Sequence, residues 1–252
     1  MKLTTRNSQR PGTESYLAAN PDLSVLESQG YFVYPVDTLR VLNANPWARM
    51  ADLPLAHQEM GTKGLDVVLS GPDTILKPGT WPHPPMGPVM RNGHHDTQGE
   101  RGHFRGLVAV LEDGTIIVDK ADGASAKDLK SRFSQSGNPL RDVCGGGALI
   151  VQNGRKVSDI DLMREQLYGG NPGGIRSKPM KHGVHVIFGI RYGRAFGAVC
   201  WSKSGIQIRD DFMSLGFSAV LKLATGSSAY LNDQEYVLAG QNAVGLGIKL
   251  RR

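Results

Sequence analysis

Runs of apolar residues along the chain predict a protein built mainly from short strands. Leu65–Leu69 and Ala148–Val151 are brief apolar runs beside glycine, a pattern typical of buried strands. Tyr31–Tyr34 has the same character, and we expect Pro35 to stop it because proline lacks the N–H that a strand ladder uses. Closing strands are predicted at Ala219–Leu223, Tyr236–Leu238 and Val244–Leu250.

Two pairs of apolar runs predict antiparallel hairpins. Leu107–Leu111 leads to Asp113-Gly114 and then to a second apolar run, and Asp-Gly readily adopts the positive φ angles of a tight turn. The same pattern recurs where Val184–Ile190 and Ala195–Trp201 are separated by Tyr-Gly. We therefore expect neighbouring strands to be largely antiparallel.

Amphipathic segments between the strands predict a few short helices. Ser125 can cap a helix that ends near Phe133, and Ile208–Leu215 has apolar residues at helical spacing. Two more helices are expected, at residues 46–60 and 160–167. Because strands outnumber helices, the sequence predicts an α+β protein with mixed, largely antiparallel sheets.

The ends and the longest connection of the chain have distinct compositions. Residues 1–30 are polar, with Pro11-Gly12 and Asn20-Pro21, and we expect an irregular N-terminal arm that contacts other chains of an assembly. Residues 31–252 are expected to form a single domain. Residues 70–106 are predicted to be a long loop rich in glycine and proline, and ordered loops of this length are often functional.

Composition serves mainly to exclude classes of protein. The 32 glycines and 14 prolines have no fixed period, which excludes collagen, and a hydrophobic fraction of 40% excludes wholesale disorder. No apolar run is long enough for a membrane helix, and the first residues lack the apolar core of a signal peptide. We expect a protein without a membrane partner or a classical secretion signal, located in the cytoplasm, or in the virion if the source is viral.

Charge and cysteine usage narrow the partners further. The net charge of +6 favours acidic partners in general, but the basic groups at 127–132, 176–181 and 249–252 are small and lack interleaved aromatic residues. No specific nucleic-acid partner is therefore expected. Cys144 and Cys200 can in principle form a bridge, although two buried free thiols are the favoured interpretation.

Two further patterns suggest ligands at first sight. The four histidines and Asp96 of the long loop are potential metal ligands, but their spacing fits no standard metal motif. We therefore expect them to be exposed polar residues, and we expect no metal and no cofactor. Gly145–Gly147 suggests a nucleotide loop, but no P-loop lysine follows, and close backbone packing explains it better. The potential metal ligands are His83, His94, His95, Asp96 and His103.

Several segments follow one another in an informative order. Gly64–Gly71 is a strand that ends in glycine, Gly87–Gly93 has a glycine at each end, and Gly145–Gly154 is a glycine-rich strand with a turn. Met213–Ser228 joins a helix, a Leu-Gly step, a strand and a Gly-Ser-Ser loop. Over most of residues 48–231 this succession resembles the phosphodiester glycosidase family. The resemblance implies that family's fold and the hydrolysis of sugar phosphodiesters.

Three polar features depart from the pattern of that family. Ala224 stands where the family has the aspartate of an Asp-Gly-Gly loop, and Ser70 stands where it has the asparagine of Asn-Gly. Histidines replace its arginines at the start of a strand. The loop after Thr225 keeps residues whose N–H and hydroxyl groups can bind a phosphate or a sugar. By this resemblance the candidate binding residues are Ser70, His182, His185, Gly226, Ser227 and Ser228.

The departures favour a non-catalytic or catalytically degenerate module, because alanine cannot act as a general acid or base. Such a module would bind a sugar or phosphate, or act as a structural subunit of a larger assembly such as a viral or phage particle. The alternative is an active hydrolase of glycosyl phosphodiesters with a remodelled site. His182 and His185 are three residues apart on a predicted strand, so we expect them to face opposite sides.

Overall fold

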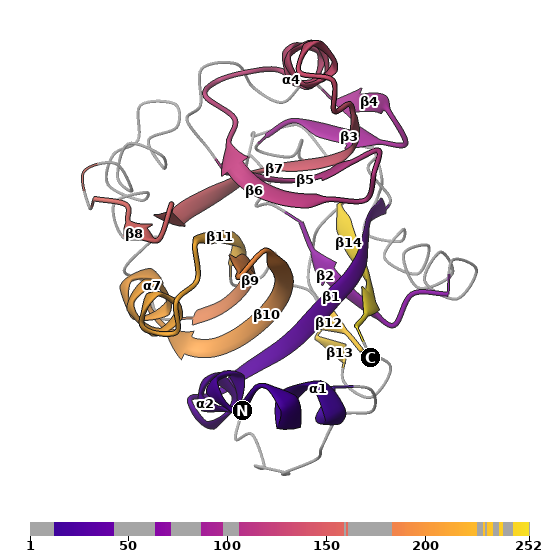
Figure 1. The fold of residues 1–252 in the computed structure, drawn as a ribbon. Helices are drawn as coiled ribbons and strands as arrows, with labels where there is room; N and C mark the ends of the chain where they lie inside the picture. Colours follow the sequence, from indigo (N-terminus) through magenta and orange to yellow (C-terminus); the bar gives the residue numbers. More distant parts are fainter. Residues whose placement is uncertain are drawn as a thin grey trace, which may run out of the picture.

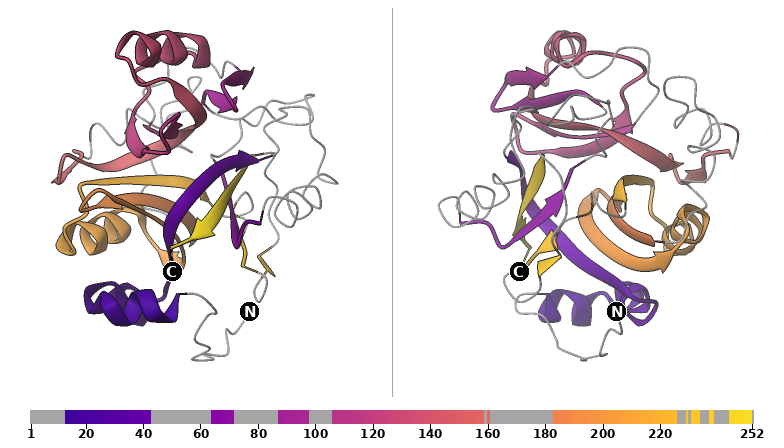
Figure 2. Two further views of the ribbon diagram at one scale, coloured as in Figure 1. Left: turned by 45° about the vertical axis from the view of Figure 1, so that its right-hand side comes forward. Right: turned by 180° about the vertical axis from the view of Figure 1, so that it is seen from behind.

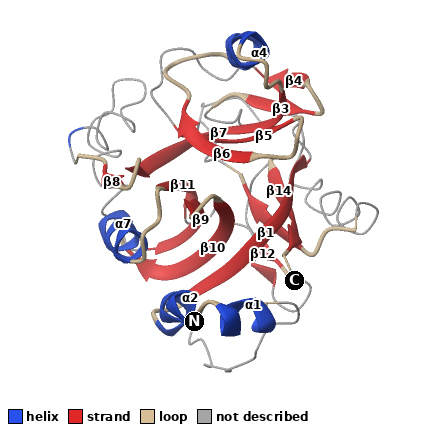
Figure 3. Ribbon diagram, viewed as in Figure 1, coloured by secondary structure: helices blue, strands red, loops and turns tan. Residues whose placement is uncertain are grey.

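Figure 1 shows the computed structural model, in which antiparallel strands form the body of the molecule and helices lie on its outside. The residues described are 13–42, 64–71, 87–97, 106–158, 160, 183–225, 229, 231–233, 237–238 and 244–251. Figure 3 shows how far strands predominate over helices. The predicted α+β class with largely antiparallel pairing is confirmed.

The strands join along one hydrogen-bonded path in the order β13-β12-β2-β14-β1-β10-β9-β11-β7-β3-β4, while β5 and β8 pair with β7, and β6 pairs with β5. Every pairing in the described part is antiparallel. The strands are β1 (Tyr31–Leu42), β2 (Val67–Ser70), β3 (Val89–Arg91), β4 (His94–Thr97), β5 (Gly106–Leu111), β6 (Ile116–Lys120), β7 (Leu140–Gln152), β8 (Arg155–Lys156), β9 (Gly183–Arg191), β10 (Arg194–Lys203), β11 (Ala219–Thr225), β12 (Leu231–Asn232), β13 (Val237–Leu238) and β14 (Gly245–Leu250).

Helices cover the strands from two sides (Figure 2). One helix lies over the β3–β7 part of the sheet, and the other three lie beside β1 and the β9–β11 part. The helices in the described residues are α1 (Glu14–Ala19), α2 (Pro21–Ser28), α4 (Ala126–Gln135) and α7 (Gly205–Ser214).

Alternation along the strands divides the core into layers, because successive side chains point to opposite faces. Val186 and Phe188 of β9 belong to the central cluster, which also holds residues of β5, β7 and β14. Ile187, between them, belongs to the cluster beneath α1, α2 and α7. A third cluster lies between α4 and β5 and β7. The β9–β11 strands are thus buried on both faces.

Both predicted hairpins are confirmed. β5 and β6 pair from Gly106 to Val110, and β9 and β10 pair around the turn at Tyr192 and Gly193. Those two turn residues have φ angles of 49° and 70°, as the tight turn requires. The Asn153-Gly154 turn after β7 has the same backbone form.

The two predicted helices that fall in the described part are also confirmed, at α4 and α7. The Ser125 side chain accepts a hydrogen bond from the Asp128 N–H, and the Asp128 side chain accepts one from the Ser125 N–H. Ser204 and Gln207 form the same capping box at α7, so this helix begins at Gly205, earlier than predicted. The free, buried states of Cys144 and Cys200 agree with the favoured interpretation of these thiols.

The prediction of an irregular N-terminal arm is wrong for residues 14–28, which form α1 and α2. Pro21 occupies the first turn of α2, where its missing N–H is no loss. Leu23 and Leu26 are fully buried, and Tyr16 contacts Phe196 with ring centroids 5.9 Å apart. These helices therefore pack on the chain's own strands. The domain boundary after residue 30 stays a prediction.

The prediction that Pro35 stops the first strand is also wrong, since β1 continues to Leu42. Pro35 pairs with Phe196 of β10, while the pairing of β1 with β14 begins only at Val36. Proline is tolerated where one side of a strand is still an edge. Its carbonyl accepts a hydrogen bond from the Arg251 N–H at 3.0 Å.

The predicted long loop at 70–106 contains two strands, β3 and β4, which pair with each other, and β3 also pairs with β7. The strand predicted at 148–151 is part of the 13-residue β7, which includes Gly145–Gly147. A Cβ on Gly147 would lie 2.6 Å from the Lys222 carbonyl oxygen, so close backbone packing is the role of this glycine.

Some predictions fall outside the described residues. They are the helix at 46–60, the helix at 160–167 beyond residue 160, and the histidines His83 and His103. The backbone of His94, His95 and Asp96 lies in β4. In the described part of the chain, no group of three or more His, Cys, Asp or Glu side chains can hold a metal ion. None of the described helices is long and apolar enough to span a membrane.

Candidate functional site

Two of the six candidate binding residues, Ser70 and His185, lie in the described part of the structure. His182, Gly226, Ser227 and Ser228 lie outside it. Ser70 is the last residue of β2, and His185 lies near the start of β9. Both are almost completely buried, with exposures of 1% and 0%.

The end of β2 meets the end of β11, although these strands are far apart in sequence. The Ala224 N–H donates a hydrogen bond to the Gly71 carbonyl at 3.1 Å, and the Gly71 N–H donates one to the Val244 carbonyl at 2.7 Å. A Cβ on Gly71 would lie 2.9 Å from Cys144 Sγ, which explains the glycine after Ser70. The structure therefore brings together the two segments that carry Ser70 and Ala224.

Ala224 itself is fully buried and presents only a methyl group. It has no group that can transfer a proton, bind a cation or accept a hydrogen bond from a sugar hydroxyl. The polar groups nearest in sequence are Lys222 and Thr225, on the same strand.

Lys222, Thr225 and His185 form a hydrogen-bonded chain. Lys222 Nζ donates to Thr225 Oγ1 at 2.7 Å, and Thr225 Oγ1 lies 3.4 Å from His185 Nδ1. His185 Nε2 lies 2.9 Å from the Lys203 carbonyl, which can only accept, so Nε2 carries the proton. In a neutral ring Nδ1 is then the acceptor, and the Thr225 hydroxyl is placed to donate to it. All donors in this chain point one way, from the lysine towards the histidine.

A second polar group lies beside this chain, under α7. The Tyr31 hydroxyl donates to Asp211 Oδ2 at 2.6 Å, and Lys203 Nζ donates to the same oxygen at 2.8 Å. The pKa of Tyr31 is raised, chiefly by burial and secondly by this hydrogen bond, so its hydroxyl stays protonated. We name the whole set the β9–β11 polar cluster; its members are Tyr31, His185, Lys203, Asp211, Lys222 and Thr225.

Strand irregularities lie on both sides of His185. The β9–β10 register shifts between Cys200 and Lys203, and the β9–β11 register shifts between Lys222 and Thr225. Ser202, within the first shift, has a φ of 58°, which is unusual for a residue other than glycine. Bulges of this kind redirect side chains and are common next to functional sites. Here they accompany a polar cluster inside an otherwise apolar layer.

The two thiols are not nucleophiles in this arrangement. Burial raises the pKa of Cys200 to about 12, and the positive charge of Lys203 offsets only part of that effect. Burial likewise raises the pKa of Cys144. Both thiols are therefore protonated at neutral pH.

Sequence reasoning did not single out Lys222. The available signal was a lone lysine within the apolar run Ala219–Ala224, where a charged residue requires polar partners. Lys222 is only 2% exposed. His185, which Thr225 links to Lys222, was a candidate, but nothing in the sequence placed β9 next to β11.

Comparison with known proteins supports the fold. No protein-family model and no curated protein sequence matches this chain. Among solved structures, the fold is similar to the catalytic domain of zebrafish N-acetylglucosamine-1-phosphodiester alpha-N-acetylglucosaminidase, auto-inhibited by its pro-peptide. The TM-score is 0.62 at 14% identity, over 88% of this chain and 82% of that chain. A protein from Burkholderia pseudomallei matches with a TM-score of 0.54 at 8% identity, over 87% and 71% of the two chains.

The fold is thus similar to that of a phosphodiester glycosidase. At these identities the similarity concerns the fold alone, and the chemistry of the site has to be argued from its own residues.

Proposed function

We propose that this chain is a catalytically degenerate module of phosphodiester-glycosidase-like fold that binds a sugar phosphate as a subunit of a larger assembly. The observation that carries the proposal is the fully buried methyl group of Ala224 at the junction of β2 and β11. The family resemblance places a carboxylate there.

The chemistry of the remaining groups supports binding more than hydrolysis. Cleaving a glycosyl phosphodiester needs a group that gives a proton to the leaving oxygen or takes one from water. Ala224 supplies neither. Lys222 and Thr225 instead provide a cation and a hydroxyl, directly before the Gly226–Ser228 segment, whose N–H and hydroxyl groups suit a phosphate.

Two measurements on the full chain test this proposal together. Sugar phosphodiesters with an aryl leaving group should show no hydrolysis above buffer, and calorimetric titration with N-acetylglucosamine 1-phosphate should show binding. Lys222→Met should abolish that binding, whereas Lys127→Gln, at an exposed lysine of α4 outside the polar cluster, should not change it. Absence of binding in the unchanged protein would contradict the proposal.

The alternative function is an active hydrolase with a remodelled site, and the Lys222–Thr225–His185 chain favours it. A hydroxyl beside a histidine acceptor has the arrangement of an activated nucleophile. Release of the aryl group by the unchanged protein, lost in both Thr225→Ala and His185→Asn, would establish this alternative. Ala224→Asp separates the two cases further, because gain of hydrolysis on adding the carboxylate identifies a degenerate enzyme.

The proposed assembly requires a contact surface on this chain. Because α1 and α2 bury their apolar residues on the chain's own strands, a partner would use their outer side, where Val25 is 42% exposed. Light scattering should then give a mass above 27.2 kDa, and Val25→Lys should lower it. A monomer at all accessible concentrations would contradict the assembly.

A further inference from the structure

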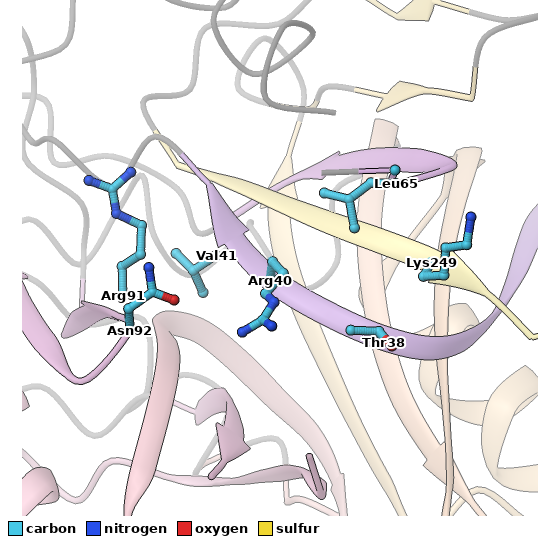
Figure 4. Close-up of a pocket in the computed structure, with 8 residues that line it drawn as sticks. Thr38, Arg40, Val41, Leu65, Arg91, Asn92 and Lys249 are labelled. Atoms are coloured by element: carbon cyan, nitrogen blue, oxygen red, sulfur yellow. The ribbon is translucent and has the colours of Figure 1, made fainter. Parts of the chain in front are cut away.

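A cavity of about 480 Å³ lies between β1, β14 and the turn that joins β3 to β4. Its cationic side chains do not converge on one ligand, because Figure 4 shows Arg91 and Lys249 at opposite ends of the lining and directed apart. Arg40 and Lys249 also each have an acidic neighbour, at 3.7 and 3.3 Å. The β9–β11 polar cluster differs from this cavity, because hydrogen bonds join its side chains to one another.

Lys203 connects the two parts of this cluster, because its side chain and its backbone have different partners. Its Nζ donates to Asp211 Oδ2 at 2.8 Å and lies 4.8 Å from the centroid of the Tyr31 ring. Its carbonyl oxygen lies 2.9 Å from His185 Nε2. A change at Asp211 on α7 can therefore reach His185 on β9 through this one residue.

The backbone around Lys203 has an unusual form that its surroundings must maintain. Ser202, directly before it, has a φ of 58°, and the β9–β10 register shifts between Cys200 and Lys203. Ser204, directly after it, is the N-cap of α7. A left-handed residue other than glycine is strained and persists only where neighbouring contacts hold it. The ion pair of Lys203 with Asp211, whose side chains are only 19% and 22% exposed, is such a contact.

The Lys203 carbonyl decides which ring nitrogen of His185 carries the proton. A carbonyl can only accept, so it selects the neutral ring with a proton on Nε2, and Nδ1 then accepts from the Thr225 hydroxyl. The oxygen of that hydroxyl accepts from Lys222 Nζ at 2.7 Å. If the carbonyl moved away, a proton on Nδ1 would become possible and would compete with Lys222 for the same oxygen. The position of the Lys222 ammonium group thus depends on a carbonyl of another strand.

We propose that Asp211 is a positioning residue for the phosphate site, an inference that rests on the proposed function. By holding Lys203, Asp211 fixes the tautomer of His185, and the Thr225 hydroxyl then places the Lys222 ammonium group for the ligand. Asp211 acts through these residues and not on the phosphate itself, since two negative groups repel each other.

Side-chain 15N NMR of the ligand-free full chain tests the tautomer, since protonated and unprotonated ring nitrogens differ widely in chemical shift. The signals of His185 are identified by their loss in His185→Asn, and the unchanged protein should have its proton on Nε2. Asp211→Ala should give a mixture of both tautomers. Asp211→Asn keeps an oxygen that can accept from Lys203 and should retain the Nε2 tautomer. Lys203→Met breaks the same link from its other end and should also give the mixture, so the test does not depend on the folding of one variant.

Calorimetric titration of the Asp211 variants with N-acetylglucosamine 1-phosphate gives the second readout. Asp211→Ala should weaken binding about tenfold, as expected for a misplaced charged hydrogen bond. Loss of a carboxylate by itself would strengthen the binding of an anion, so weaker binding is a specific result. Asp211→Asn should bind at least as tightly as the unchanged protein. Asp210→Ala is the matched control, because it removes a 51% exposed carboxylate from the same helix, and it should change neither readout.

The two readouts separate this inference from the proposed function. If the unchanged protein does not bind N-acetylglucosamine 1-phosphate, the proposed function fails, while the NMR spectra still decide whether Asp211 sets the tautomer. The positioning role is overturned if His185 keeps its Nε2 tautomer in both Asp211→Ala and Lys203→Met. It is also overturned if the tautomer changes in Asp211→Ala and binding does not. A purely structural Asp211 would lower the stability of Asp211→Ala and leave the ring nitrogens of His185 unchanged.

Discussion

At the scale of single residues, Lys222 is the most informative side chain, because a lysine that is 2% exposed is rare in an apolar strand. Its Nζ donates to Thr225. Burying an ammonium group carries a desolvation penalty that can exceed what its partners return. A lysine at this position is therefore better explained by binding than by stability.

Lys222→Met should therefore have opposite effects on stability and on binding. Methionine keeps the length of the side chain and removes the charge, so the free energy of unfolding should stay the same or rise by about 1–2 kcal/mol. Binding of the sugar phosphate should be lost. Urea unfolding and calorimetric titration of the same preparation test both expectations. A loss of stability above about 2 kcal/mol would instead make Lys222 a structural residue.

The buried thiols predict how stability depends on alkaline pH. The pKa of Cys200 is raised from 9.0 to about 12 by burial, so the folded state keeps a proton that the unfolded state releases. This contribution is fully present below pH 9 and is lost as the pH rises towards 12. Between these pH values the Cys200 thiol should make the free energy of unfolding fall by up to about 1.4 kcal/mol per pH unit. Cys200→Ala should remove this part of the slope. Ser136→Ala, at an exposed helix end, should leave that slope unchanged.

At the scale of elements, α7 positions Asp211 over the polar cluster, and its first turn depends on a capping box. Ser204 accepts from the Gln207 N–H at 3.2 Å, and the Gln207 side chain accepts from the Ser204 N–H at 2.8 Å. Ser204→Ala removes one of these bonds and should lower the free energy of unfolding by about 1 kcal/mol.

Ser214 offers a matched control for that prediction. It lies at the other end of the same helix, where its hydroxyl donates to the Asp211 carbonyl within the last turn and caps no N–H. Ser214→Ala should change stability by less than about 0.5 kcal/mol. Thermal unfolding of both variants tests this difference in stability. If the two variants lose the same stability, the capping box contributes nothing.

The elements that could be predicted from the sequence are those with local signals. The residues at Asp113-Gly114 and Tyr192-Gly193 favour a tight hairpin turn whatever the position of the two strands in the sheet. α2 was missed because Asn20-Pro21 is as typical of a turn as of a helix start, and only tertiary packing distinguishes the two. Pro35 was misjudged because its tolerance depends on where β14 begins to pair.

The candidate site was predictable only in part, for the same reason. The family resemblance drew attention to Ser70, Ala224 and His185, and the structure places Ser70 next to Ala224 through Gly71. The hydrogen-bonded chain from Lys222 through Thr225 to His185 depends on the pairing of β9 with β11, which no local pattern encodes.

At the scale of the whole molecule, glycine allows backbones from different parts of the sheet to approach one another. A Cβ on Gly106 would lie 2.5 Å from Leu221 Cδ1, and one on Gly87 would lie 2.3 Å from the Gly145 backbone. These distances are shorter than any real Cβ contact. The glycine content that the sequence shows therefore serves the packing between strands as well as the turns.

Gly147 connects this packing to the candidate site. A Cβ on Gly147 would lie 2.6 Å from the backbone carbonyl oxygen of Lys222. Gly147→Ala must push β7 and β11 apart, so the free energy of unfolding should fall by about 1–3 kcal/mol. Sugar phosphate binding should weaken with it, since Lys222 moves with its backbone. Gly183→Ala is the matched control: nothing lies within 4 Å of that Cβ, and both properties should be retained. If Gly147→Ala loses stability but binds as tightly as the unchanged protein, the ligand does not depend on the position of Lys222, and the binding site has to be sought elsewhere.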